Sequence, residues 1–168
     1  MAATVLIREK NTAGETPTDK TSGTVRFKTA DDSNVDNNAP MVKPGAGTNF
    51  SFQKWLRGDI TVSPAGSITN WKFYTDGTQS NTGVIQYAKT TNPTAFATPV
   101  LETATTGYTD AFTYTSGSPK GLGVGNVGPY TATGDFGDYL EMCMTVGTTV
   151  TAPGTLTAEV MTFSWDET

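Results

Sequence analysis

Few residues of the chain have the type and spacing that catalysis or metal binding requires. The sequence holds no histidine and a single cysteine, Cys143. Ser-His-Asp and Cys-His catalysis and His-ligated metal sites therefore cannot form, and one thiolate cannot build a zinc site. Cys143 lies inside a strand-like stretch without an adjacent cation, so we expect it to pack as a small hydrophobe. An enzyme is therefore the least favoured class, and we expect no cofactor.

Two stretches match ligand sites by their letters. Residues 123–128 read GVGNVG and fit the dinucleotide pattern GxGxxG, but that site needs a helix directly after it, and Pro129 follows instead. We therefore interpret this stretch as a flexible loop. Residues 31–38 are rich in oxygen ligands for calcium, although their spacing departs from that of an EF-hand. A cation site stays open there, and an Asx-rich turn is the simpler interpretation. The residues concerned are Asp31, Asp32, Ser33, Asn34, Asp36, Asn37 and Asn38.

Two further groups carry charges in suggestive patterns. Asp135 and Asp138 could act as a carboxylate pair in hydrolysis, but their Gly-rich surroundings are more typical of a turn. Arg57-Gly58-Asp59 spells an integrin-type tripeptide, and we expect it in the middle of a strand rather than at a loop tip. Neither group favours a catalytic or receptor-binding function.

Trp55 and Arg57 are the candidate partner-binding residues. Residues 50–62 alternate between apolar and polar types, and successive side chains of a strand point to opposite faces. Trp55 and Arg57 have the parity opposite to the apolar set. Two interpretations stay open: a loop or second layer covers Trp55, or it is a subunit contact, since Trp and Arg are enriched among interface anchors. The apolar set, interrupted by Lys54 and Gly58, is Phe50, Phe52, Leu56, Ile60 and Val62.

The elements that must position these residues are short strands. Residues 50–62 and 67–75 flank the turn Ser63-Pro64-Ala65-Gly66, which predicts an antiparallel pair. Residues 10–22 read as an exposed loop. Two long loops, residues 30–48 and 116–134, are rich in turn-forming residues. Further strands are predicted at residues 3–9, 23–29, 83–90, 96–101, 108–115, 138–146 and 155–165.

Length and composition predict one all-β domain over residues 1–168. About a fifth of the residues are Thr, a β-branched type that favours strands, and 18 Gly mark frequent turns. No helical pattern persists for more than about two turns. About seven to nine short strands with two long loops indicate a β-sandwich, for which an immunoglobulin-like topology and a jelly roll both stay open.

The charge balance narrows the possible partners. The net charge is −5, whereas nucleic acid and anionic membranes attract basic surfaces. No apolar run reaches the roughly 20 residues of a membrane span. The N-terminal residues MAATVLIREK do not read as a signal peptide. We therefore expect no nucleic-acid or membrane partner, and synthesis in a cytoplasm.

Three segments carry a resemblance to a known class of proteins. They read GTVRFKTADDSNVDNNAPMVKPGAGTNFSFQKWLRGDITV at 23–62, SITNWKFYTDG at 67–77 and MTFSWDET at 161–168. In style and order they resemble small virion structural proteins of tailed bacteriophages, above all the β-sandwich proteins that decorate or cement the capsid exterior. The resemblance covers less than half of the chain and leaves residues 92–134 unmatched.

The resemblance implies a function, a location and partners. The chain would be a capsid decoration protein, made in the host cytoplasm, that binds the major capsid protein as a homotrimer and stabilises the head from outside. The alternative is a carbohydrate-binding or tail-fibre domain in which Trp71, Tyr74 and Tyr87 form an aromatic platform. A tail or connector component of the virion is a third hypothesis.

Overall fold

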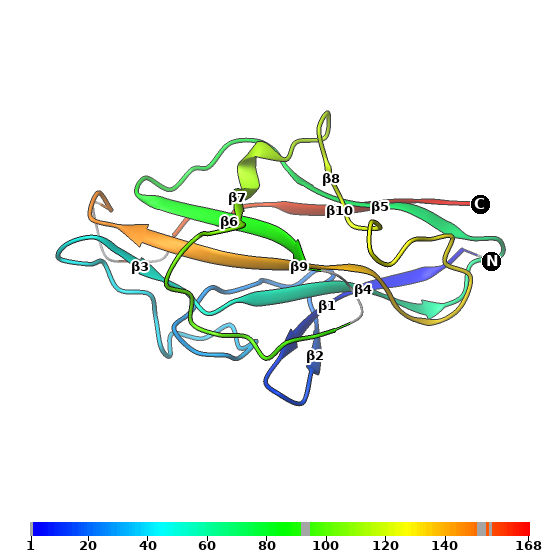
Figure 1. Ribbon diagram of the computed structural model, residues 1–168, viewed down its shortest axis with the longest axis horizontal. Coiled ribbons are helices and arrows are strands. Elements are labelled where there is room, and N and C mark those ends of the chain that lie inside the picture. The colour runs from blue at the N-terminus through cyan, green and yellow to red at the C-terminus, as the bar shows by residue number, and fades with distance from the viewer. Residues whose placement is uncertain (1, 92–94, 151–153, 155) are drawn as a thin grey trace.

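Two antiparallel β-sheets make up the fold (Figure 1). The computed structural model describes residues 2–91, 95–150, 154 and 156–168. Within these residues the chain forms ten strands and one short 3-10 turn, η1 (Ala111–Thr113). None of the described helices is long and apolar enough to cross a membrane.

The larger sheet has the strand order β2-β1-β4-β9-β6-β7, and β3 pairs separately with the end of β9. Its long central strand, β9, pairs with both β4 and β6. The strands of this sheet are β1 (Thr4–Asn11), β2 (Thr16–Asp19), β3 (Thr48–Phe50), β4 (Lys54–Val62), β6 (Val84–Thr91), β7 (Thr109–Asp110) and β9 (Gly134–Gly147).

The smaller sheet has the order β10-β5-β8, with β10 (Met161–Glu167), β5 (Ile68–Thr75) and β8 (Lys120–Gly121). The strand orders β1-β4-β9-β6 and β10-β5 follow the A-B-E-D and F-C orders of an immunoglobulin constant-type sandwich. The short strands β2, β3, β7 and β8 are additions to that scheme. The all-β sandwich is therefore confirmed, and the strand order favours the immunoglobulin-like topology over a jelly roll.

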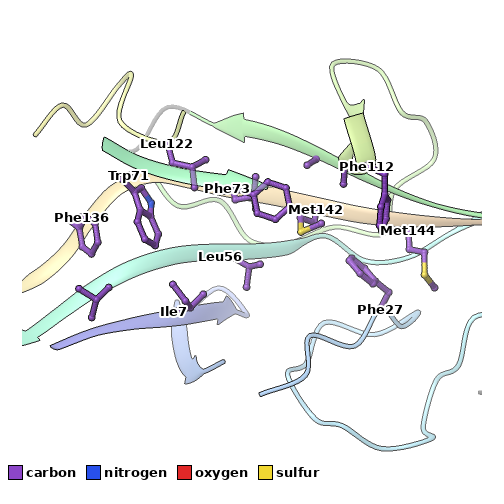
Figure 2. Packing of buried hydrophobic residues seen from close by; sticks show 14 of the residues in the cluster. Ile7, Phe27, Leu56, Trp71, Phe73, Phe112, Leu122, Phe136, Met142 and Met144 are labelled. Atoms are coloured by element: carbon purple, nitrogen blue, oxygen red, sulfur yellow. The ribbon is translucent and has the colours of Figure 1, made fainter. Parts of the chain in front are cut away.

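The hydrophobic core lies between the two sheets (Figure 2). Leu56 of β4 is 1% exposed and Phe73 of β5 is fully buried, so the apolar parity of β4 does face the core. Trp71 and Phe136 pack side by side across the sheets, with ring centroids 4.8 Å apart. Burial of this apolar surface is the main stabilising contribution to the fold. Other core residues are Val5, Ile7, Ile60, Ile68, Val84, Ala88, Leu122, Leu140, Met142 and Met144.

The predicted pair of strands around the Pro64 turn is wrong in its pairing. β4 pairs with β1 and β9, whereas β5 lies in the other sheet between β10 and β8. The turn therefore carries the chain from one layer of the sandwich to the other. Alternation predicts that each strand has one buried face, but it does not reveal which strand lies alongside.

The predicted strand over residues 50–62 is also interrupted near its start. β3 ends at Phe50 and β4 begins at Lys54, while Phe52 forms only an isolated bridge with Leu101. The backbone changes partner here, because Ser51 donates to Met144 of β9 and Gln53 donates to Val100. Phe50 and Phe52 are consequently only half-buried, and Val62 at the far end is 38% exposed.

Several other predicted strand boundaries need correction. Residues 23–29 form no strand, although Phe27 reaches the core. Residues 96–101 form none either, apart from the Leu101 bridge. The strand predicted over 108–115 shortens to β7, because η1 follows it directly. The loop predicted over residues 10–22 contains β2, and the strand predicted from 155 begins at Met161, while Thr155 itself lies outside the described residues.

Candidate functional site

Trp55 lies on the face of the larger sheet that points away from the core, and its own chain covers it. The side chain is 2% exposed. Its ring meets Phe96 and Tyr139 edge-to-face, with centroids 5.3 Å away in both cases. The indole Nε1 donates a 3.0 Å hydrogen bond to Oε1 of Gln53. Trp55 is thus packed and hydrogen-bonded, as a buried tryptophan usually is.

Arg57 is held beside the same aromatic cluster. Its Nε donates to the Gly137 carbonyl at 3.1 Å, and the guanidinium lies 4.8 Å from the centroid of Tyr139. Asp135 is 3.8 Å away and completes its surroundings. The Tyr139 hydroxyl in turn donates to Glu15, and burial together with that hydrogen bond raises the pKa of Tyr139. The guanidinium of Arg57 therefore makes its contacts within the chain in this structure.

These contacts bear directly on the two interpretations of Trp55. The structure has the covered arrangement, with Phe96 from the segment after β6 lying over the indole. A partner contact through Trp55 stays a prediction that would require Phe96 to move away. The charged residues of the integrin-type tripeptide also have partners within the chain, because Asp59 accepts a 2.9 Å hydrogen bond from Nε of Arg8.

The glycine-rich loop, residues 122–130, surrounds a carboxylate of the protein itself. Asp138 is 2% exposed and accepts hydrogen bonds from three successive backbone amides, those of Val124 (2.8 Å), Gly125 (3.0 Å) and Asn126 (2.8 Å). Successive N–H groups that converge in this way form an anion-binding nest. The side chain of Asp138 takes the amides that a phosphate would need, so the stretch is a loop, as expected, but an anchored one and not a flexible one.

Asp135 and Asp138 do not work as a catalytic pair in this structure. Asp138 accepts hydrogen bonds from the glycine-rich loop, whereas Asp135 accepts a 2.7 Å hydrogen bond from Nζ of Lys10. Both carboxylates therefore have structural partners, but they lie within strand β9, so the prediction that they are turn residues is wrong.

The Asx-rich stretch gathers around a buried lysine instead of a metal ion. Lys28 is fully buried, and its Nζ donates 2.8 Å hydrogen bonds to both Asp32 and Asp36. Burial opposes ionisation of Asp32 and is the largest single influence, but the hydrogen bonds from Lys28 and the Asn34 amide, together with the charges of Lys28 and Lys54, lower the pKa of Asp32. For Asp36, the hydrogen bond from Lys28 is the main cause of its lowered pKa. The ammonium group of Lys28 thus lies between the carboxylates where a metal ion would otherwise bind. No metal-ligating cluster occurs in the described part of the chain.

A second buried charge group lies next to it. Glu9 of β1 and Lys54 of β4 are both fully buried, and Nζ of Lys54 donates to Oε1 of Glu9 at 2.9 Å. Lys54 also donates to the backbone carbonyl of Asp32 at 2.5 Å, and Lys20 approaches Glu9 to 3.6 Å. We call these side chains the buried charge cluster, in which the lysines and Glu9 are buried while the two aspartates are partly exposed: Glu9, Lys20, Lys28, Asp32, Asp36 and Lys54.

Sequence reasoning missed this cluster. Lys54 interrupts the apolar parity of β4, and that interruption was the available signal: a lysine on a core-facing position needs a buried partner. Glu9 shares the parity of Val5 and Ile7, which is the matching signal on β1. The cluster ties the first long loop to the larger sheet through Lys54 and Lys28.

The aromatic platform expected for a carbohydrate site is not formed. Trp71 is 2% exposed and stacks on Phe163 inside the core, with centroids 5.3 Å apart. Tyr74 lies on β5 in the smaller sheet, while Tyr87 lies on β6 in the larger one. The three rings therefore do not share a surface. Cys143 is fully buried, and burial raises its pKa to about 12, which agrees with its expected packing role.

Among the described residues, the two most exposed large hydrophobic side chains lie on the glycine-rich loop. Val124 is 78% exposed and Val127 is 69% exposed. They border a hollow of about 320 Å³ that Tyr130, Lys72 and Trp71 also line. Large apolar side chains displayed beside a hollow are typical of a protein contact surface.

Comparison of the chain with family models, with curated proteins and with solved structures finds no match in any of the three.

Proposed function

We propose that this protein is a non-enzymatic virion structural protein, which decorates the exterior of a phage head by binding the major capsid protein. The observation that carries the proposal is the pair of exposed valines, Val124 and Val127, on a loop whose backbone is fixed from inside by Asp138. The resemblance of residues 23–77 and of the last strand to capsid decoration proteins supplies the partner. The resemblance also implies a homotrimer.

The glycine-rich loop is anchored at three points. Leu122 donates to the Trp71 carbonyl at 2.9 Å, and Tyr130 exchanges two 2.9 Å backbone hydrogen bonds with Ile68. Asp138 holds the loop between these ends. A loop that is ordered before contact loses little conformational entropy on binding, so its apolar side chains contribute more of their burial energy to affinity.

The charge distribution supports a structural function as well. The lysines of the buried charge cluster form ion pairs within the chain, and the buried carboxylate of Asp138 accepts hydrogen bonds from the chain's own backbone. Such groups fix the first long loop and the glycine-rich loop against the sandwich. A protein that reinforces a shell needs this kind of stiff framework and several modest contacts, which multivalent attachment strengthens by roughly 10²–10⁴.

Co-sedimentation with empty shells of the same phage, stripped of this protein, tests the proposal. Wild type should pellet with the shells at a saturating stoichiometry. The double variant Val124→Ser, Val127→Ser should stay in the supernatant, because the apolar contact is lost. The matched control is Val35→Ser, Val42→Ser, which alters two exposed valines of the first long loop, 55% and 62% exposed, and should bind like wild type. Wild type that never pellets would refute the proposal.

The carbohydrate-binding or tail-fibre hypothesis remains the alternative function. It needs a site other than the platform of Trp71, Tyr74 and Tyr87, since these rings lie apart. Binding of the isolated protein to a glycan array, together with no binding to shells, would favour this alternative.

A further inference from the structure

Strand β10 is the longest strand at an end of either sheet in the described part of the chain. It pairs with β5 on one side, and no strand lies on the other. The strands at the other sheet ends are short: β2 has four residues including Pro17, and β7 and β8 have two each. Short edges and edge prolines prevent pairing with other chains, whereas β10 has seven residues and no proline or lysine.

The hydrogen-bond pattern shows which backbone groups of β10 are open. The Thr75 amide donates to Tyr114 at 2.8 Å, and the Trp71 carbonyl accepts from Leu122 at 2.9 Å, so these residues of β5 bond away from β10. Directly opposite residues of an antiparallel pair bond in the same sense. Met161 and Phe163 face Thr75 and Phe73, and therefore direct their N–H and C=O groups to the open edge.

The side chains along this edge suit another strand. Met161 and Phe163 pack on the core but stay half-buried, because nothing covers them from the open side among the described residues. Val160, directly before β10, is 67% exposed. A strand laid beside β10 would satisfy the open backbone groups and bury these apolar side chains, as strand addition does in peptide recognition.

We propose that the occupant is a second copy of this chain, paired antiparallel along β10 about a twofold axis centred on Thr162. In this register Met161 lies opposite Phe163 of the partner subunit, and the two residues exchange the backbone hydrogen bonds that the open edge offers. Thr162 lies opposite its own copy, a favourable cross-strand pair. The two three-stranded sheets become one continuous sheet of six strands.

Charge favours this antiparallel arrangement over a parallel one. The acidic residues of β10, Asp166 and Glu167, lie at its C-terminal end. Antiparallel pairing sends them to opposite ends of the contact, whereas parallel pairing would stack like charges. The register shift between Ser164 and Asp166 also ends the regular part of the strand before the acids. The paired stretch, residues 160–164, is therefore uncharged and short, so we expect a dimer that depends on concentration.

This inference goes beyond the proposed function and does not rest on it, because a twofold contact differs from the trimer implied by the resemblance. Light scattering and sedimentation equilibrium of the full chain separate them. We expect twice the mass of one chain at high concentration and one chain mass on dilution. A stable trimer, or a monomer at all concentrations, would overturn the twofold pair without touching the capsid-binding proposal.

The register is tested by charges at its centre. Thr162→Lys and Thr162→Glu each place like charges opposite one another in the homodimer, and should each raise the dissociation constant about tenfold or more. An equimolar mixture of the two variants should dimerise again, because Lys then faces Glu. If both variants dimerise like wild type, or if the mixture stays monomeric, the proposed register is wrong.

A backbone variant gives an independent measurement. Met161→Pro removes the open N–H while leaving the hydrogen bonds to β5 in place, so the chain should fold and stay monomeric. Thr16→Lys, on the exposed edge strand β2, is the matched control and should dimerise like wild type. Circular dichroism confirms that each variant is folded. Dimers of a folded Met161→Pro protein would contradict pairing through β10.

Discussion

At the scale of single residues, buried charges fix the parts of this chain that lack regular structure. Asp138 holds the glycine-rich loop, and the buried charge cluster holds the first long loop. A buried ion pair contributes little net stability by itself, but removing one partner leaves an uncompensated charge in the interior. The lysines and carboxylates therefore specify one arrangement of the loops.

Replacement of Asp138 tests this account at the glycine-rich loop. Asp138→Ala should destabilise the protein by about 1–3 kcal/mol, because three backbone amides lose their acceptor. Hydrogen exchange at Val124, Gly125 and Asn126 should quicken selectively, and chemical denaturation measures the loss of stability. Unchanged exchange at these three amides would show that Asp138 does not order the loop.

Replacement of Glu9 tests the buried pair. Glu9→Gln leaves the Lys54 ammonium without a charged partner in the core, and should cost about 3–5 kcal/mol. The double variant Glu9→Gln, Lys54→Met should recover part of that loss, since the Lys54 charge is gone and only Lys20 still lacks its carboxylate partner. Equal stability of the single and double variants, measured by denaturant unfolding, would show that the two side chains do not interact.

The free energy of unfolding should also depend on pH. Because Lys28 lowers the pKa of Asp32 and Asp36, the folded state gains stability above their unfolded pKa of about 3.9 and loses it as the pH falls below that value. Thermal unfolding between about pH 5 and pH 2 measures this loss. Asp36→Asn should flatten the dependence, and an equally steep profile for this variant would exclude Asp36 as a contributor.

At the scale of elements, alternation between apolar and polar residues predicted the strands that bury one face. It failed where buried polar side chains hold irregular backbone in place. β5, β6 and most of β9 lie where the pattern placed them. Residues 23–29 alternate as a strand would, yet Lys28 in that stretch belongs to the buried charge cluster and the backbone stays irregular. Pairing between strands was beyond prediction, because it depends on contacts distant in the chain.

The two faces of β4 give matched predictions. Leu56→Ala opens the core between the sheets and should cost about 2–5 kcal/mol, whereas Trp55→Ala removes the ring that Phe96 packs against and should cost about 3–5 kcal/mol. Denaturant midpoints measure both losses. Only Trp55→Ala should expose residues 95–108 to proteolysis. A Trp55→Ala protein of wild-type stability that fails to bind shells would instead favour the partner contact.

At the scale of the whole molecule, composition and periodicity were sufficient for the fold class but not for the site. Thr-rich alternation and frequent turns predicted an all-β sandwich, which the two sheets confirm. The contact surface was not predictable, because the sequence pattern does not show that Asp138, 14 residues after Val124, accepts the backbone amides of this loop while Val124 and Val127 stay exposed. The GxGxxG pattern by itself is that of a dinucleotide site, whereas in the structure the loop amides bind the side chain of Asp138.

Electron cryomicroscopy of stripped shells recombined with the protein tests the central claim most directly. The account predicts density for the sandwich on the exterior of the head, oriented so that the glycine-rich loop and its exposed Val124 and Val127 face the major capsid protein. Density at the tail, no added density at all, or a sandwich whose glycine-rich loop points into solvent would contradict it.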